Sequence, residues 1–220
     1  MGPIEVPIIM ISKKVVKRDT CKLILHKFRN KEYTDVTNPI EGNENVVMPV
    51  DETLANNFKY KDKYGRSYWT MTPHDKDDFL YMIDKVFDKV PDHPDFEFIS
   101  YMQVIEYPMG TMCNQHKDTG DMYDTATAIL VLDDDFEGGK FSVDDIVIDA
   151  KQGDLVMFNH STTTYHGVSP VTKGVRTVLA LWFQAQHSTP ELAEEDIIDD
   201  KPKFDENSET TVSYTHLTLP

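Results

Sequence analysis

A series of short, β-rich runs from residue 96 onward constrains the fold of this chain more than any other feature. The runs are FEFISYMQVIEYP, TATAILVLD, KFSVD, DIVID, DLVMFN and RTVLALWFQ, and they are separated by the turn segments PMG, EGG, KQG and KG. β-Branched and aromatic residues favour strands, whereas glycine and proline favour turns. Several short strands at this spacing are typical of a β-sandwich or barrel.

Two amphipathic segments precede these runs and predict helices. RDTCKLILHKFRN, at residues 18–30, places apolar side chains at Leu23, Ile24 and Phe28. TPHDKDDFLYMIDKVFDKVPDHP, at residues 72–94, repeats apolar residues at intervals of three and four and ends in prolines, which terminate helices. We therefore predict a mainly β fold with flanking helices, of the α+β class.

Changes in amino-acid composition and in the spacing of apolar residues divide the chain into three parts. We expect an N-terminal helical and irregular part at residues 1–95 that packs on a β core at residues 96–188. Residues 189–220 follow as an acidic tail, expected to be disordered because charge runs with few large apolar residues bury little surface. The last eight residues, SYTHLTLP, lose this charge abruptly and are left out of the fold prediction.

The charge balance excludes one large class of partner. The chain carries 22 Lys and Arg against 38 Asp and Glu, a net charge of −16, so it lacks the basic footprint of a nucleic-acid-binding protein. Neither a signal peptide nor a stretch of membrane-spanning length is recognised, and the two cysteines, Cys21 and Cys113, imply no disulfide framework. We expect a cytoplasmic protein with reduced thiols and no membrane partner.

The segment CNQHKD suggests a metal site. His116 and Asp118 stand two residues apart, so in a strand their side chains point to the same side. A third ligand has two candidates, His160 and His166, in FNHSTTTYHGV. Two histidines and one carboxylate form the facial triad of non-haem Fe(II) oxygenases, although Zn(II) accepts the same ligands.

Residues around the candidate triad favour an oxygenase that uses a keto-acid co-substrate. Arg176 lies ten residues after His166, beyond a glycine-containing turn, so the two residues can lie on neighbouring antiparallel strands. An arginine can bind the distal carboxylate of a keto-acid through two parallel hydrogen bonds. Tyr107, nine residues before His116, could donate its hydroxyl to the same carboxylate, and Trp182 shares the strand parity of Arg176.

These motifs, taken in order, carry a resemblance to a known family. YPMGTMCNQHKD, VLDDDFEGGKF, KQGDLVMF and HGVSPVTKGVRTVLALW follow one another as in the 2-oxoglutarate- and Fe(II)-dependent oxygenases, specifically the prolyl 4-hydroxylase-like branch, over about residues 98–184. The resemblance implies a double-stranded β-helix (jelly roll) core. It assigns iron to His116, Asp118 and His166, and the co-substrate to Arg176, Tyr107 and Thr127.

The same resemblance implies a function and its cofactors. The expected protein is a 2-oxoglutarate/Fe(II)-dependent dioxygenase that uses O2, with ascorbate as a further candidate cofactor. It would hydroxylate a peptidyl residue, prolyl by family analogy, and release succinate and CO2. Collagen-type relatives carry lysine in place of Arg176, and Cys113 replaces an aromatic residue common in the family, so a collagen-like substrate is not implied.

Two other functions stay open at this point. One is an oxygenase acting on a free amino acid, another small metabolite or a nucleobase. Nucleic-acid demethylases of the superfamily carry a second arginine where this chain has Trp182, which argues against a nucleic-acid substrate. The other is a non-catalytic jelly-roll binding module, against which the intact triad and Arg176 both speak.

Overall fold

The computed structural model describes seven stretches of the chain. They are residues 9–35, 58–71, 76–90, 98–118, 124–160, 164–184 and 212–215. Within them, none of the helices combines the length and the apolar character that crossing a membrane requires.

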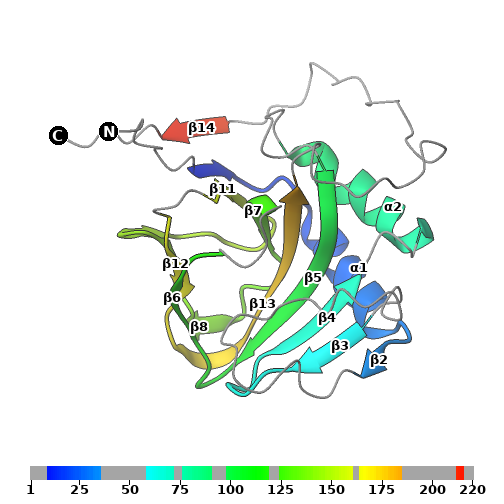
Figure 1. The fold of residues 1–220 in the computed structure, drawn as a ribbon, viewed down its shortest axis with the longest axis horizontal. Helices are drawn as coiled ribbons and strands as arrows, with labels where there is room; N and C mark the ends of the chain where they lie inside the picture. The colour runs from blue at the N-terminus through cyan, green and yellow to red at the C-terminus, as the bar shows by residue number, and fades with distance from the viewer. Residues whose placement is uncertain are drawn as a thin grey trace.

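Two β-sheets and two helices form three layers (Figure 1). The large sheet has the order β14-β1-β11-β7-β13-β5-β4-β3-β2, and β8 pairs with β13 beside this path. Its strands are β1 (Ile9–Ser12), β2 (Thr34–Asp35), β3 (Phe58–Lys61), β4 (Ser67–Met71), β5 (Phe98–Pro108), β7 (Asp124–Val131), β8 (Phe136–Gly138), β11 (Leu155–Asn159), β13 (Val171–Gln184) and β14 (Val212–Thr215).

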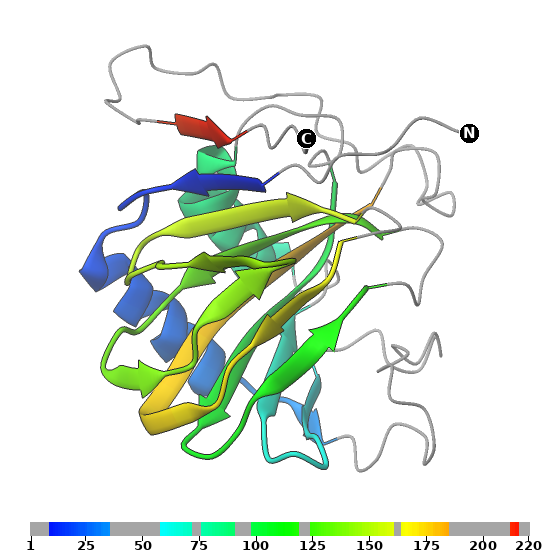
Figure 2. The ribbon, with the colours of Figure 1, turned by 90° about the vertical axis from the view of Figure 1, so that its left-hand side faces the viewer.

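The small sheet has four strands in the order β10-β9-β12-β6 and lies across from the large one. Its strands are β6 (Cys113–His116), β9 (Phe141–Val143), β10 (Ile146–Ile148) and β12 (His166–Val168). Figure 2 views the molecule from the side of this small sheet, with the helices behind the large sheet. Two facing sheets with helices outside one of them are the arrangement expected of a jelly-roll core, and the predicted fold class is confirmed.

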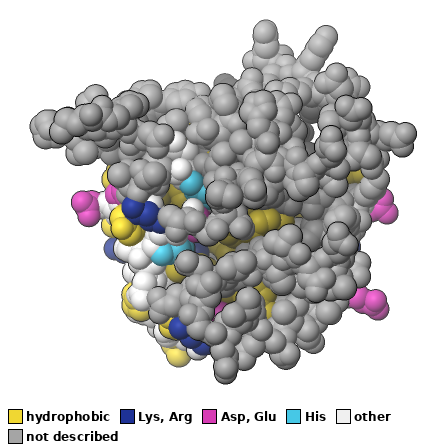
Figure 3. Space-filling model, in the orientation of Figure 1, with side chains coloured by type: hydrophobic (Ala, Val, Ile, Leu, Met, Phe, Trp, Pro, Cys, Tyr) yellow, Lys and Arg dark blue, Asp and Glu magenta, His cyan; other side chains and the backbone are white. Residues whose placement is uncertain are grey.

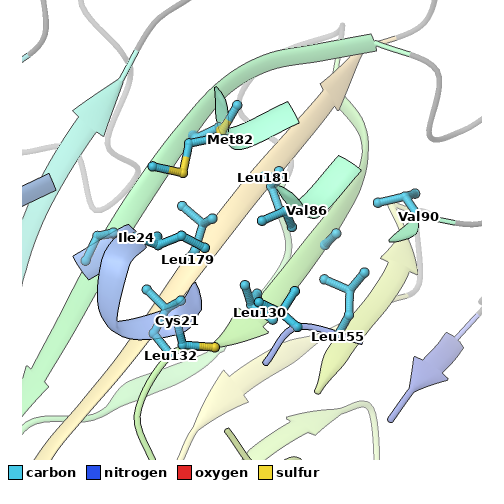
Figure 4. Close-up of a cluster of buried hydrophobic side chains, with 14 of the residues drawn as sticks. Cys21, Ile24, Met82, Val86, Val90, Leu130, Leu132, Leu155, Leu179 and Leu181 are labelled. Carbon is cyan, nitrogen blue, oxygen red and sulfur yellow. The ribbon is translucent and has the colours of Figure 1, made fainter. Parts of the chain in front are cut away.

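The helices cover the outer face of the large sheet because each has one apolar side. Helix α1 (Arg18–Arg29) buries Cys21, Ile24, Leu25 and Phe28, which recur at intervals of three and four. Helix α2 (Lys76–Val86) continues into a short 3-10 turn, η2 (Phe87–Lys89), and buries Met82 and Val86 in the same cluster. Figure 4 shows Cys21 and Ile24 of α1 and Met82 and Val86 of α2 near leucines of β7, β11 and β13. Both predicted helices are confirmed.

The central strand β13 shows how one sequence serves both faces of the sheet. Leu179, Leu181 and Phe183 belong to the cluster under the helices. Val178, Ala180 and Trp182 alternate with them and belong to a second cluster, which lies between the two sheets. Alternation of this kind follows from the two-residue period of a strand.

Strands from the predicted N-terminal part complete the large sheet. β1 pairs with β11, with Ile9 opposite Phe158, and β4 pairs with β5, with Ser67 opposite Glu106. The buried carboxylate of Asp154 joins the start of the chain to this core, because it accepts hydrogen bonds from the Lys13 ammonium and the Lys14 backbone N–H, both at 2.9 Å. The N-terminal region therefore shares one sheet with the oxygenase-like segment.

The expected acidic tail lies mostly outside the described residues. Four of its residues, Val212–Thr215, form β14, which pairs with the edge strand β1. Three of these four residues belong to the segment SYTHLTLP, which was left out of the fold prediction, so the expected disorder of the acidic tail stays a prediction. The sequence VSYT is rich in β-branched and aromatic residues, which favour an added edge strand.

Candidate functional site

A cluster of two histidines and one carboxylate lies between the sheets, at the end of β6. β6 and β12 are antiparallel neighbours in which His116 stands opposite His166, and the centres of their imidazole rings are 4.3 Å apart. Asp118 follows β6 by two residues. Its carboxylate oxygens lie 3.4 Å from His116 Nε2 and 3.5 Å from His166 Nε2. One ligand atom from each residue falls within 4.8 Å of the others, which is close enough for a single ion.

The hydrogen bonding of His116 leaves the correct ring nitrogen facing this cluster. Its Nδ1 lies 2.9 Å from the Asn114 carbonyl oxygen. A carbonyl only accepts hydrogen bonds, so Nδ1 carries the proton and Nε2 points toward Asp118. A backbone partner of this kind fixes both the tautomer and the ring orientation of a metal-binding histidine.

Charge in the cluster is arranged as a cation site requires. Burial acts against the protonated form of His116, but its hydrogen bonds to Asp118 and Cys113 raise its pKa to about 10. Burial works to raise the pKa of Asp118, yet His116 and the other two histidines lower it to about 2. Burial lowers the pKa of His166 to about 4, so this imidazole is neutral at physiological pH. In the metal-free protein, a proton on His116 thus balances the ionised Asp118.

A third histidine, His160, lies against the same carboxylate from the end of β11. Its side chain is 7% exposed, and its Nε2 is 3.4 Å from Asp118 Oδ2 and 2.6 Å from the Thr127 hydroxyl. His160 is outside the three-residue ligand group. Thr127, expected to line the co-substrate pocket, therefore contacts the residue that adjoins Asp118. Histidine side chains reach the surface on the side of the molecule where β6 and β12 lie (Figure 3).

Arg176 and Tyr107 form a second polar group on the inner face of the large sheet. The two residues stand opposite each other on β13 and β5, and the guanidinium carbon is 5.2 Å from the centre of the tyrosine ring. Arg176 is 3% exposed. Burial lowers its pKa, and no described carboxylate lies within ion-pair distance of it. A buried guanidinium without an anion is costly, so this site favours an anionic ligand.

The backbone around Arg176 is shaped to let its side chain pass. Gly139 has a φ of +56°, and a Cβ atom there would come within 3.0 Å of Arg176 Cδ. Glycine is the residue that adopts this left-handed backbone at little cost and leaves the space free. The EGG turn recognised in the sequence thus has a direct spatial relation to the candidate carboxylate-binding arginine.

Trp182 lies on the same face as Arg176, six residues further along β13. It is partly buried among the inner cluster and stacks on Tyr101, with ring centres 4.8 Å apart. This placement agrees with the predicted strand parity. It makes Trp182 part of the wall between the sheets.

One arginine near the site was missed by the sequence analysis. Arg66 comes directly before β4, in a region read from the sequence as polar and irregular, and its guanidinium carbon is 5.7 Å from the centre of the Tyr107 ring. The signal that could have found it is YKDKYGRSYW, in which Asp62 and Gly65 punctuate two aromatic-rich runs, as in a hairpin.

Comparison with protein families identifies the central part of the chain. Residues 102–184 match the model of the 2OG-Fe(II) oxygenase superfamily. Over this segment the chain is therefore similar to the 2OG-Fe(II) oxygenases. Members of this family use Fe(II), 2-oxoglutarate and O2, and the two histidines and one aspartate at the end of β6 are the ligand set that such an iron site requires.

Curated relatives of the oxygenase-like segment are prolyl hydroxylases. The chain is 39% identical over 64 residues to human prolyl 3-hydroxylase 2, and 40% identical over 81 residues to prolyl 3-hydroxylase 1 of Gallus gallus. These matches cover 26% and 32% of this chain. The chain spans only 9% and 11% of the length of these two relatives.

A solved structure supports the same fold. The prolyl hydroxylase of Trichoplax adhaerens, in complex with a hypoxia inducible factor oxygen degradation domain peptide fragment, is 14% identical, with a TM-score of 0.54 over 81% of this chain and 84% of that one. A Pseudomonas putida prolyl-4-hydroxylase is 16% identical, with a TM-score of 0.49 over 81% and 92%. The first of these likenesses supports the jelly-roll assignment of the oxygenase-like segment.

Proposed function

We propose that this protein is a 2-oxoglutarate/Fe(II)-dependent dioxygenase that hydroxylates a peptidyl residue, prolyl in the first instance. The observation that carries this proposal is that the small sheet supplies one polar site and the large sheet another. A His–Asp–His cluster suited to a divalent ion occurs together with a buried arginine that has no carboxylate partner among the described residues. A metal hydrolase or a simple metal-binding module has no need of the second site.

Each residue of the proposed site has a definite task. His116, Asp118 and His166 would hold Fe(II), and the Arg176 guanidinium would bind the distal carboxylate of 2-oxoglutarate, assisted by Tyr107. When bound, the iron would supply oxygen activation, so that 2-oxoglutarate, O2 and a substrate C–H yield succinate, CO2 and the hydroxylated product. The Asn114 carbonyl keeps the His116 ring oriented, and the inner apolar cluster excludes water from the reacting groups.

The substrate class rests on similarity. The curated relatives are named prolyl 3-hydroxylases, and the Trichoplax adhaerens structure contains a peptide fragment. A peptide or protein substrate is therefore the first candidate for this chain as well. A free amino acid or another small metabolite is the alternative, and ascorbate is a candidate reductant for the same reaction.

A direct test begins with protein purified without oxygen. Metal analysis should find about one iron per chain, because one facial triad binds one ion. Succinate release should then be measured over a panel of proline-containing peptides, with and without ascorbate, and with free proline and proline-free peptides as controls. The Asp118→Ala variant, which lacks one proposed metal ligand, is the negative control for this assay.

The proposal predicts succinate release that depends on both iron and a proline-containing peptide, with one oxygen atom added to that peptide. Amino-acid analysis of the product would distinguish 3-hydroxyproline from 4-hydroxyproline. Iron-dependent succinate release that a free amino acid stimulates and no peptide does would overturn the peptidyl substrate. Failure to bind 2-oxoglutarate in the presence of metal would overturn the enzymatic assignment itself.

A further inference from the structure

A second arginine faces Tyr107 from a hairpin outside the family-matched segment. Ser67, the first residue of β4, pairs with Glu106, so Arg66 stands level with Tyr107 on the neighbouring strand. On the other side of β5, Arg176 pairs with Tyr107. The guanidinium carbons of Arg66 and Arg176 lie 5.7 Å and 5.2 Å from the centre of the same phenol ring. Arg66, Tyr107 and Arg176 thus form a row across three adjacent strands.

The hairpin turn fixes the direction of the Arg66 side chain. Asp62 Oδ1 accepts hydrogen bonds from the backbone N–H groups of Tyr64, at 3.0 Å, and Arg66, at 2.9 Å, and Asp62 Oδ2 accepts one from Arg66 Nε at 2.5 Å. Gly65 closes the turn with a φ of +91°. The Asp62 carboxylate binds Nε, and the guanidinium also interacts with Tyr107 and Cys113.

The surroundings of Arg66 are those of a residue inside the site. Its side chain is 12% exposed, and its guanidinium also lies 5.7 Å from the Tyr68 ring centre. Burial and Cys113 raise the pKa of Tyr107 to about 12, and Arg176 and Arg66 act in the opposite direction, with a hydrogen bond from Arg66 to the phenol contributing. Arg66 therefore acts electrostatically on a residue of the proposed co-substrate site.

The charges at this end of the sheet leave a surplus of one cation. Asp62 balances Arg66, while Arg176 has no carboxylate partner among the described residues. Glu106 on β5 already has a partner, since it accepts hydrogen bonds from Arg29 Nε, at 3.1 Å, and Arg29 Nη2, at 2.5 Å, on helix α1. An anion that reaches Arg176 would meet its positive potential and also that of Arg66, which Asp62 reduces, since both side chains are largely buried and little screened by solvent.

We propose that Arg66 is a positioning residue for the dicarboxylate co-substrate, which holds Tyr107 and adds positive charge beside Arg176. This inference rests on the proposed function and adds to it a part of the chain that precedes the oxygenase-like segment. The β3–β4 hairpin then belongs to the co-substrate site, and its Asp62–Arg66 pair sets the position of the second cation.

The test compares two metal chelators in the 220-residue protein loaded with Mn(II). 2-Oxoglutarate chelates the metal and carries a distal carboxylate, whereas oxalate chelates the metal and carries no distal group. Arg66→Gln should raise the Kd of 2-oxoglutarate by about threefold to tenfold, as expected for weakening one charge-assisted contact, and leave the Kd of oxalate unchanged. Arg66→Lys, which keeps the charge but not the bond geometry to Asp62, should fall between wild type and Arg66→Gln.

Arg29→Gln is the matched control, because it removes an equal charge and a carboxylate partner from the outer side of β5. It should leave both Kd values unchanged. Mn(II) affinity measured without a chelator, together with the melting temperature of each variant, reports whether the site is still folded.

Two outcomes would overturn the role of Arg66. Equal 2-oxoglutarate affinity in wild type and Arg66→Gln is one, and an equal loss of affinity for 2-oxoglutarate and oxalate is the other, since it indicates a purely structural effect. The Arg176→Ala variant shows whether such an outcome contradicts only the role of Arg66 or the proposed function as well. If Arg176→Ala weakens 2-oxoglutarate selectively and Arg66→Gln does not, only the further inference fails. If wild type does not bind 2-oxoglutarate, both fail.

Discussion

The two faces of the large sheet are built from the same strands but follow different rules. On β13, the outer face presents Leu179, Leu181 and Phe183 to the helices, and the inner face presents Arg176 and Trp182 between the sheets. The outer cluster is apolar, whereas the inner face combines apolar side chains with the buried guanidinium of Arg176 and faces the small sheet, whose strand β6 is followed by the ionised Asp118. The alternation of a strand thus lets one segment provide stability on one side and chemistry on the other.

Removing a proposed metal ligand should give the largest effect and should affect the inner face alone. Asp118→Ala or His166→Ala is expected to abolish iron-dependent succinate release, because three protein ligands are the minimum for this type of site. The melting temperature of the metal-free protein should stay close to that of wild type. Loss of Mn(II) binding in His160→Ala, with binding retained in His166→Ala, would show that the third ligand is His160.

Truncating a buried side chain on the outer face should have the opposite pattern. Leu181→Ala removes a side chain that is fully buried beneath the helices, and we expect the free energy of unfolding to fall by about 2–5 kcal/mol. Denaturant unfolding measures this value. The exposed Val147, changed to Ala, is the control and should alter stability by no more than about 0.5 kcal/mol. An Leu181→Ala protein that keeps its stability but loses 2-oxoglutarate affinity would break the division between the faces.

Arg176→Ala should separate co-substrate binding from metal binding within the inner face. The expected result is an increase in the KM for 2-oxoglutarate of at least about tenfold, or roughly 1.4 kcal/mol, with Mn(II) affinity unchanged. Arg176→Lys should retain part of the function, because it keeps the charge but loses the two-pronged geometry. Identical 2-oxoglutarate dependence in Arg176→Ala and wild type would remove the main support for a keto-acid oxygenase.

Metal affinity should depend on pH because a proton occupies the cluster when metal is absent. Asp118 and Cys113 together raise the pKa of His116 to about 10, so at neutral pH this imidazole must lose a proton before it can bind an ion. Apparent Mn(II) affinity should therefore rise with pH, by up to about tenfold per unit between pH 6.5 and 8.5. Calorimetric titrations in buffers of different ionisation enthalpy would show release of about one proton. Affinity that does not change with pH would contradict the proposed His116–Asp118 pairing.

The smallest effect is expected at His160, which contacts Asp118 but lies outside the ligand group. His160→Asn should lower Mn(II) affinity by about tenfold or less and retain most turnover, since it removes support for a ligand and leaves the three ligands in place. Thr127→Val should produce a similar, smaller change, because the Thr127 hydroxyl is within 2.6 Å of His160. A loss of activity comparable to that of Asp118→Ala would place His160 among the ligands.

Strands with a clear pattern of apolar residues could be predicted from the sequence, and strands without one could not. The long apolar runs predicted β5, β7, β11 and β13, because side chains buried on both faces of a sheet leave a clear pattern. The short strands β6 and β12, of four and three residues, carry polar and ligand residues and have little apolar pattern of their own. They became visible only through the HxD spacing and the later histidine.

Some residues of the candidate site could be recognised from short sequence motifs, and others could not. The structure brings His116, Asp118 and His166 together at the predicted spacing and sets Arg176 opposite Tyr107, although their roles stay predictions. Arg66 could not be placed from the chain, because its position depends on the pairing of β4 with β5, about 40 residues later in the sequence. The pairing of distant strands is decided by the whole core and leaves no short motif.

The pairing of β1 with β11 also governs how the chain reaches its native state. Ile9 meets Phe158, and Lys13 and Lys14 meet Asp154, so the first strand of the large sheet depends on contacts across most of the molecule. Closing so large a loop costs entropy before any contact compensates for it, and folds dominated by such contacts form slowly. During synthesis, β1 must leave the ribosome long before its partner exists. The N-terminal strand is therefore expected to join the sheet only after β11 has been made, so the sheet beside the proposed iron site is completed late in folding.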